Sequence, residues 1–237
     1  SITSAVKGGS IKVGAGADSL YVGSSLGGYI DVGSGADYVS AGSSLSVATV
    51  LGGSGSDTLS LAGGSGSSVV GGYGADSLLF TSHLKASTLF GGESGDGGSA
   101  LDGDESIYVG GSISGVLAAG NYGNDTLSVT GSAVASSMYG GSGNDIISLD
   151  SVASSGVIYG NSGNDTVNVG GSLTGGASIF GGNNTNSGDK DDDSISVATI
   201  SSGYIDGDQG DDTVVVANVA QKVTMYGSSG ADSLSFG

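Results

Sequence analysis

A twelve-residue stretch, Met138-Tyr-Gly-Gly-Ser-Gly-Asn-Asp145-Ile-Ile-Ser-Leu149, returns twenty residues later as Ile158-Tyr-Gly-Asn-Ser-Gly-Asn-Asp165-Thr-Val-Asn-Val169. Each copy is a glycine-rich turn that an aspartate closes. We use the acidic residue that closes each turn as the anchor of its repeat. The eleven anchors are Asp18, Asp37, Asp57, Asp76, Glu105, Asp125, Asp145, Asp165, Asp193, Asp212 and Asp232. Successive anchors are 19, 20, 19, 29, 20, 20, 20, 28, 19 and 20 residues apart, so one repeat runs along the whole chain.

Apolar residues keep a fixed distance from the anchors. The second and fourth residues after an anchor are apolar, as Ile147 and Leu149 are after Asp145. This alternation is typical of a short β-strand. A further apolar residue lies seven positions before most anchors, as Met138 does. We therefore predict two short strands and two bends in each repeat.

A single repeat of this length cannot bury its own apolar face, so successive repeats must stack. Stacked parallel strands place equivalent residues above one another, about 4.8 Å apart. The sequence thus predicts an all-β fold, a right-handed parallel β-solenoid (a β-roll or β-helix) of about eleven turns of 19–20 residues. We expect a single domain over residues 1–237, with acidic loop insertions at 91–105 and 181–193, where the anchor spacing lengthens.

The composition narrows the functional classes. The chain has 50 glycines, no proline, no cysteine and a formal net charge of -18, so packing or metal must hold the fold without disulfides. The acidic balance disfavours nucleic acid and anionic membranes and favours divalent cations. Neither a leader peptide nor an apolar run of bilayer length is found, so we expect no membrane insertion. Because the sequence starts and stops inside a repeat, we expect a segment of a longer protein or a body that stacks end to end.

The anchor carboxylates point to metal binding. Like charges about 5 Å apart repel by roughly 0.8 kcal/mol in water and about 3 kcal/mol near a protein surface. Glycines can adopt left-handed dihedrals that turn carbonyl oxygens inward as ligands. Ligand sets made only of oxygen favour Ca²⁺ over zinc or copper. We predict all eleven anchors as metal ligands along one edge, with up to about ten calcium ions between the turns.

Several repeats share a longer motif, which reads Gly52-Gly-Ser-Gly-Ser-Asp57, Gly71-Gly-Tyr-Gly-Ala-Asp76 and Gly140-Gly-Ser-Gly-Asn-Asp145. It resembles the RTX nonapeptide Gly-Gly-x-Gly-x-Asp-x-(apolar)-x, and the resemblance covers essentially the whole chain. It implies a calcium-bound β-roll of an extracellular protein that Gram-negative bacteria export by type I secretion. The anchors and the carbonyls of their loops would be the ligands. The chain departs from the family pattern because the motif occupies only one bend per turn, Glu105 replaces aspartate, and Asp191 replaces the second glycine.

Two outward-facing features leave several interpretations open. The single calcium row also resembles the ice-binding region of a calcium-dependent bacterial adhesin, although the threonine file of that region is missing here. Hydroxyl groups such as those of Thr126 and Ser128 could meet ice or sugar, or could simply solvate the sheet. Aromatic residues before the turn glycines should point outward and either form a lateral contact or be covered by the inserted loops. They are Phe90, Tyr139, Tyr159, Phe180 and Tyr226.

No catalytic constellation is found in the sequence, and the single histidine, His83, is expected in a solvated bend. We therefore predict that the chain is not an enzyme. The leading hypothesis is a non-catalytic, extracellular, calcium-dependent structural protein of the bacterial cell surface, a surface-layer or adhesin segment. Expected partners are calcium, further copies in lateral or end-to-end contact, and a cell-surface polysaccharide. The alternatives are an ice- or polysaccharide-binding adhesin region and an accessory β-roll module of a secreted enzyme.

Overall fold

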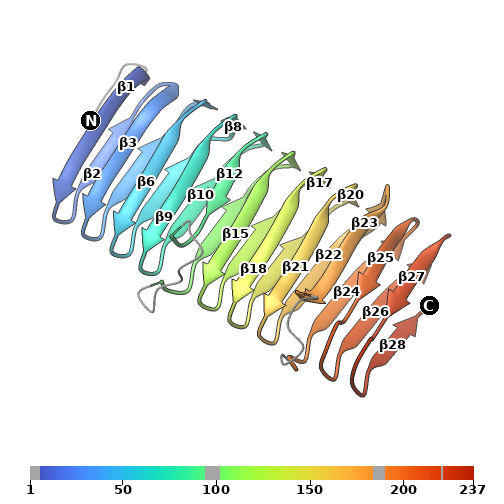
Figure 1. The fold of residues 1–237 in the computed structure, drawn as a ribbon. Coiled ribbons are helices and arrows are strands. Elements are labelled where there is room, and N and C mark those ends of the chain that lie inside the picture. The colour runs from blue at the N-terminus through green and yellow to red at the C-terminus, as the bar shows by residue number, and fades with distance from the viewer. Residues whose placement is uncertain (1–5, 94–101, 184–189, 220) are drawn as a thin grey trace.

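The computed structural model describes residues 6–93, 102–183, 190–219 and 221–237. These residues form strands and turns without a helix, and successive turns stack into one elongated body with the termini at opposite ends (Figure 1). The strands pair in parallel with their equivalents in neighbouring turns, in most turns about 20 residues apart along the chain. The prediction of an all-β parallel β-solenoid of about eleven turns is confirmed.

Each turn in the middle of the stack contains three strands, where the sequence predicted two. One turn consists of β14 (Ile113–Ser114), β15 (Leu117–Tyr122) and β16 (Thr126–Val129). The next turn repeats them as β17 (Ala133–Val134), β18 (Ser137–Ser142) and β19 (Ile146–Leu149). The additional strand is only two residues long and lies in the bend that lacks carboxylates, which we had predicted to contain no strand.

The strands form three series along the stack. The post-anchor series follows the anchors: β2 (Ser19–Val22), β4 (Tyr38–Ala41), β7 (Thr58–Leu61), β10 (Ser77–Phe80), β13 (Ser106–Val109), β16, β19, β22 (Thr166–Thr174), β24 (Ser194–Ile200), β26 (Thr213–Val219) and β28 (Ser233–Phe236). The bend series comprises β5 (Leu45–Ser46), β8 (Gly64–Ser65), β11 (Leu84–Lys85), β14, β17 and β20 (Ala153–Ser154). The pre-anchor series comprises β1 (Val6–Ala15), β3 (Leu26–Ser34), β6 (Thr49–Ser54), β9 (Ser68–Tyr73), β12 (Thr88–Phe90), β15, β18, β21 (Val157–Ser162), β23 (Ala177–Gly182), β25 (Gly203–Asp206) and β27 (Val223–Tyr226).

The two long repeats keep the strands in register. Ser77 of β10 pairs with Ser106 of β13 across the first insertion, and Thr166 of β22 pairs with Ser194 of β24 across the second. The predicted insertions at 91–105 and 181–193 lie partly outside the described residues, because 94–101 and 184–189 are not described. Their described ends show that the extra residues are accommodated at the turn without shifting the stack.

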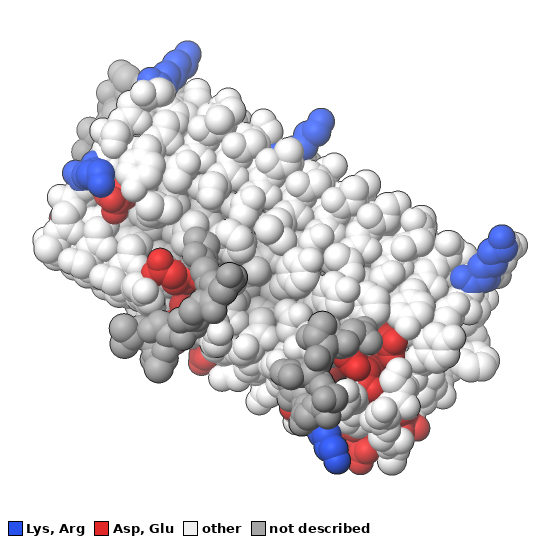
Figure 2. Space-filling model, in the orientation of Figure 1, with Lys and Arg blue, Asp and Glu red and all other residues white. Residues whose placement is uncertain are grey.

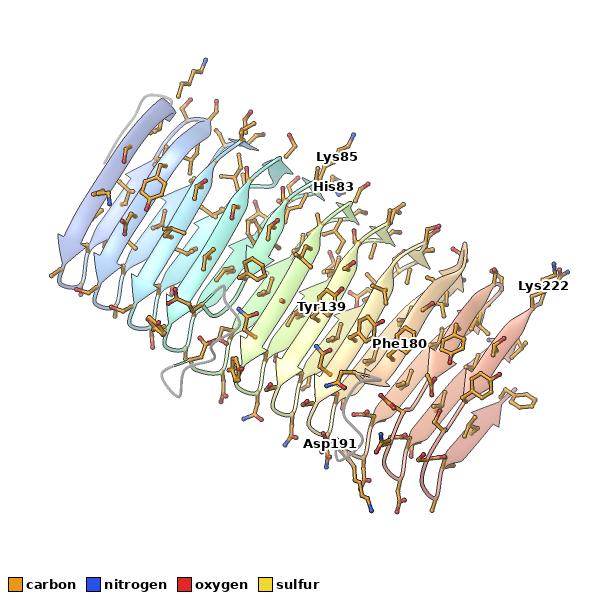
Figure 3. All side chains as sticks on the ribbon, in the orientation of Figure 1. His83, Lys85, Tyr139, Phe180, Asp191 and Lys222 are labelled. Atoms are coloured by element: carbon orange, nitrogen blue, oxygen red, sulfur yellow. The ribbon has the colours of Figure 1, made fainter. Side chains whose placement is uncertain are left out.

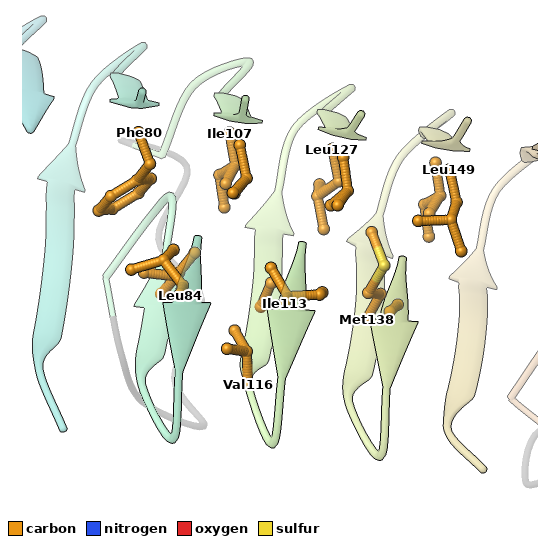
Figure 4. Packing of buried hydrophobic residues seen from close by; sticks show 14 of the residues in the cluster. Phe80, Leu84, Ile107, Ile113, Val116, Leu127, Met138 and Leu149 are labelled. Atoms are coloured by element: carbon orange, nitrogen blue, oxygen red, sulfur yellow. The ribbon is translucent and has the colours of Figure 1, made fainter. Parts of the chain in front are cut away.

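The core is a thin column of aliphatic side chains inside the three strand series (Figure 4). The predicted inward positions are buried, as at Leu127 in the post-anchor series and Met138 in the pre-anchor series. The bend series adds Ile113, which is equally buried. Leu234 and Phe236 were also predicted to point inward but are 39% and 72% exposed, because they lie on the last described turn, against which no further turn packs in the structure.

Candidate ion site: a buried carboxylate ladder

The anchors stack in one column, and the nine anchors of the interior turns are buried. Each anchor lies at the end of the glycine-rich turn that links a pre-anchor strand to a post-anchor strand. Asp145 is 1% exposed and Glu105 is 2% exposed, whereas Asp18 and Asp232 on the terminal turns are half-buried. The sequence predicted a carboxylate row along one edge, and the structure places that row inside the edge, shielded from solvent.

A hydrogen-bonded ladder joins the anchors. The backbone amide of Asp125 donates to Oδ1 of Asp145 at 2.7 Å, and the amide of Asp145 donates to Oδ1 of Asp165 at 2.7 Å. Nine of the ten steps between anchors have this contact, with N···O distances from 2.7 to 3.1 Å. Each carboxylate therefore fixes the turn beside it through a charge-assisted hydrogen bond.

The step from Asp76 to Glu105 is different. The glutamate side chain is one methylene longer, and its Oε1 accepts a hydrogen bond from the amide of Gly103 at 3.2 Å. The carboxyl group of Glu105 also contacts that of Asp125. Glu105, which replaces the aspartate of the motif, is thus the anchor at which the hydrogen bonding of the anchor ladder changes.

The second oxygen of most anchors has no hydrogen-bond donor. The atoms in this position that are buried and unpaired within the described chain are Oδ2 of Asp37, Asp57, Asp76, Asp125, Asp145, Asp165 and Asp212, and Oε2 of Glu105. In the turns whose first residue is glycine, Oδ2 of the aspartate packs against that glycine, whereas Val32 holds this position in the turn of Asp37. A Cβ atom at Gly52 would lie 2.7 Å from Oδ2 of Asp57. At Gly52 the close approach of the carboxylate therefore favours glycine, and the carboxylate itself lacks a partner for one oxygen.

Burial raises the pKa of these carboxyl groups. The pKa of Asp145 rises to about 7, and those of Asp165 and Asp193 rise to about 8. Desolvation is the main cause and neighbouring carboxylates add to it, while the amide donors act in the opposite direction. Burial also raises the pKa of Glu105, and the neighbouring carboxyl group of Asp125 adds to this rise. The column is therefore unfavourable in its fully charged, ion-free form.

A second ladder runs along the residues immediately before the anchors. The amide of Asn144 donates to Oδ1 of Asn124 at 2.8 Å, and the amide of Asn164 donates to Oδ1 of Asn144 at 2.8 Å. The donor here belongs to the later turn, so this ladder has the opposite polarity to the anchor ladder. In the turns of Asn124, Asn144 and Asn164, the Asn-Asp pair thus ties the turn to both of its neighbours, a role that we did not predict from the motif.

The turn glycines adopt the predicted left-handed backbone. Gly141 and Gly143 have φ values of 130° and 124°, and Asn161 takes the second glycine position with φ 82°. A Cβ atom at Gly141 would overlap the carbonyl oxygen of Asn121 in the preceding turn. This carbonyl oxygen therefore faces the neighbouring turn along the stack. Its use as a metal ligand stays a prediction.

The second sequence departure, Asp191, also has a structural consequence. Its Oδ2 accepts a hydrogen bond from the amide of Gly163 at 2.7 Å. Together with Asp193 and Asp208 it lines a cavity of about 10 Å³, roughly the space of one water-sized sphere. Across the described residues, no group of three or more His, Cys, Asp or Glu side chains has an arrangement that could hold a metal ion.

His83 has a structural partner, because its Nδ1 accepts a hydrogen bond from the amide of Ser112 at 2.7 Å in an exposed bend.

The described residues contain no helix that is long and apolar enough to cross a membrane. Comparisons of the chain with protein-family models, with curated proteins and with solved structures gave no match.

Proposed function

We propose that calcium ions bind between the turns at the anchor ladder, and that the chain is a non-catalytic, calcium-dependent structural segment of a bacterial cell-surface protein. The observation that carries this proposal is the column of buried carboxylates, in which eight of the eleven anchors have an oxygen without a hydrogen-bond donor. Such an oxygen has lost its water without gaining a partner, which costs about 1–3 kcal/mol or more for a charged group.

The electrostatics favour a cation over protons as the missing partner at neutral pH. The pKa values of Asp57 and Asp212 rise only to about 6, so these groups are mostly ionised at pH 7.5. A proton therefore cannot neutralise the whole column under those conditions. A divalent cation bound between two turns supplies the opposing charge to both neighbours at once.

The oxygen ligands on offer suit calcium. In the gap between two turns, the anchors on both sides, such as Asp125 and Asp145, would hold the ion, together with carbonyl oxygens of the glycine-rich turns and water. Calcium takes six to eight oxygen ligands and tolerates irregular geometry. Because at most two anchors serve each gap, neutral oxygens would supply most ligands. This composition is typical of extracellular modules with dissociation constants of about 10⁻⁴–10⁻³ M.

A chelator experiment tests calcium binding. The chain is stripped with excess chelator, and the β-sheet circular dichroism and thermal midpoint are recorded while Ca²⁺ is added, with Mg²⁺ at equal ionic strength as the control. We expect Ca²⁺ to raise the midpoint strongly, because each independent site adds about 2.7 kcal/mol at one hundred times its dissociation constant. An unchanged midpoint in chelator and in millimolar Ca²⁺ would defeat the proposal.

The surface role is supported by how the charges are distributed. Most of the face shown in Figure 2 is uncharged, and its acidic side chains gather in a few small clusters. Neighbouring copies could therefore approach side by side without strong repulsion. Electron microscopy of the purified chain should show sheets or filaments with Ca²⁺ and dispersed particles with chelator. Dispersed particles under both conditions would argue against an assembling role.

A further inference from the structure

Aromatic side chains of the pre-anchor series stack on one another along one face of the solenoid. Tyr139 and Tyr159 are stacked with ring centroids 5.5 Å apart, and Tyr159 and Phe180 are stacked 4.6 Å apart. Tyr204 and Tyr226 continue the row with tilted rings. Figure 3 labels Tyr139 and Phe180 in this row. We call these five residues the aromatic ladder.

The ladder stops at Tyr139 because the next position holds a small residue. In the preceding turn the register partner of Tyr139 is Ala119, and the partner of Ala119 one turn earlier is Phe90. One face of the Tyr139 ring is covered by Tyr159. On the other side the register position is held by Ala119, which is 7% exposed and whose methyl group is too small to cover an aromatic ring.

A groove of about 320 Å³ lies at this end of the ladder. Its lining includes Ala119 and Tyr139, together with Tyr122, Asn121, Asn161 and Asn183. The amide of Asn121 is held in place because its Nδ2 donates to the carbonyl oxygen of Glu93 at 3.0 Å. The described residues that line the groove include no charged side chain, although the chain carries a net charge of -18.

We propose that this groove binds a neutral polysaccharide, with one sugar ring lying on the Tyr139 face that is turned toward Ala119. Amide groups both donate and accept hydrogen bonds, which suits the hydroxyl groups of a sugar. The ring of Tyr139 offers an apolar platform with a polar tip. The acidic surroundings would repel an anionic polymer, whereas a neutral polymer meets no such barrier.

The residues that line the groove come from four successive turns, as Asn121, Ser142, Asn161 and Asn183 do. A groove of this kind is suited to a narrow chain that passes over a few turns. The inference extends the proposed cell-surface role by naming a ligand class. It depends on the calcium proposal only to the extent that calcium is needed for folding.

Isothermal titration calorimetry tests the proposal on the folded whole chain in Ca²⁺. The probes are hexasaccharides of β-1,4-glucose, β-1,4-mannose and α-1,4-glucose, with hexagalacturonate as the anionic comparison. We expect at least one neutral hexasaccharide to bind and hexagalacturonate not to bind. If no neutral hexasaccharide binds at millimolar concentration while circular dichroism shows a folded chain, the proposal is overturned, and the calcium proposal is unaffected.

Three variants locate the site. Tyr139→Ala removes the platform and should weaken binding at least tenfold. Ala119→Phe extends the aromatic ladder into the groove and should abolish binding while the thermal midpoint stays equal or rises. Tyr226→Ala removes a ring from the opposite end of the ladder and should leave binding unchanged. Retained binding in Ala119→Phe would overturn the assignment, and so would equal losses of hexasaccharide binding in Tyr139→Ala and Tyr226→Ala. A calcium-dependent dimer that Ala119→Phe disrupts would also overturn it.

Discussion

Each anchor aspartate has two chemically different oxygens. In Asp145, Oδ1 accepts the amide of Asp125, while Oδ2 is buried against a glycine without a donor. The first oxygen stabilises the stack in every ionic condition. The second stabilises it only when a proton or a cation is present. An asparagine at position 145 keeps an acceptor oxygen but carries no charge, whereas an alanine removes both oxygens. The two substitutions should therefore affect stability differently.

Asp145→Asn should separate the two effects. Asparagine keeps an oxygen that can accept the Asp125 amide but removes the buried charge, so the metal-free chain should gain roughly 1–3 kcal/mol of unfolding free energy. The same change should reduce the stabilisation that Ca²⁺ adds. Asp18→Asn is the control, because Asp18 is half-buried and has an anchor on only one side. Thermal midpoints of both variants with chelator and with Ca²⁺ provide the measurement, and a destabilised metal-free Asp145→Asn would contradict our interpretation.

At the scale of elements, the aromatic ladder changes one interpretation of the sequence. The outward aromatics suggested either a lateral contact or a cover by the inserted loops. In the structure, rings of the pre-anchor strands β18, β21 and β23 cover one another's faces, so the row already stabilises the chain internally. A cover from residues 94–101 or 184–189 lies outside the described residues. The other four rings of the row are partly exposed, and Tyr226 at its end is 52% exposed.

Tyr159→Ala should therefore cost more stability than Tyr226→Ala. Tyr159 has stacked rings on both sides, whereas Tyr226 has one tilted neighbour. Aromatic pairs contribute about 0.5–1.5 kcal/mol each beyond the area they bury, so the loss at Tyr159 should be about 1–3 kcal/mol. Urea unfolding midpoints in Ca²⁺ compare the two variants. Equal shifts of the urea midpoint in the two variants would show that stacking between the rings adds nothing to stability beyond the way each ring is solvated.

At the scale of the whole molecule, the anchor column makes stability depend on pH and on cations together. The solenoid is a one-dimensional stack in which each turn contacts only its neighbours. A charge in one turn therefore acts mainly on the two adjacent gaps, and the effects add up along the column. The formal net charge of -18 further opposes the compact state when no cation is bound.

The metal-free chain should lose stability as pH rises. In the folded chain the pKa of Asp165 and Asp193 is about 8, and that of Asp57 and Asp212 is about 6, above the ordinary value of 3.8. Folding therefore favours the protonated forms, and their stabilisation is fully present below the ordinary pKa and is lost as pH rises through the folded values.

Thermal midpoints measured from pH 5 to pH 9 check this dependence. We expect a continuous fall of the midpoint in chelator. In saturating Ca²⁺ the fall should be much smaller, because the bound ion stabilises the ionised carboxylates. A midpoint that rises with pH in chelator would show that the anchors are not destabilised by burial in the folded chain.

Much of the fold could be predicted because the relevant signals are local. The alternation at Ile147 and Leu149 and the spacing of the anchors predicted the strands and their stacking. The bend series was missed, although a signal for it exists: Ile113 lies eight residues after Glu105, and other anchors have an apolar residue at the same distance. A two-residue strand is too short to show an alternation.

The sequence by itself determined the period, the parallel stack and the positions of the anchors, because these follow from apolar spacing and from glycine in a chain of identical repeats. Only the tertiary structure decided that the anchor carboxylates lie inside the turn, that two ladders of opposite polarity join them, and that Tyr139 ends an aromatic row above Ala119. These features depend on contacts between residues about 20 positions apart. A single repeat does not specify which oxygen, amide or ring its neighbour places against it.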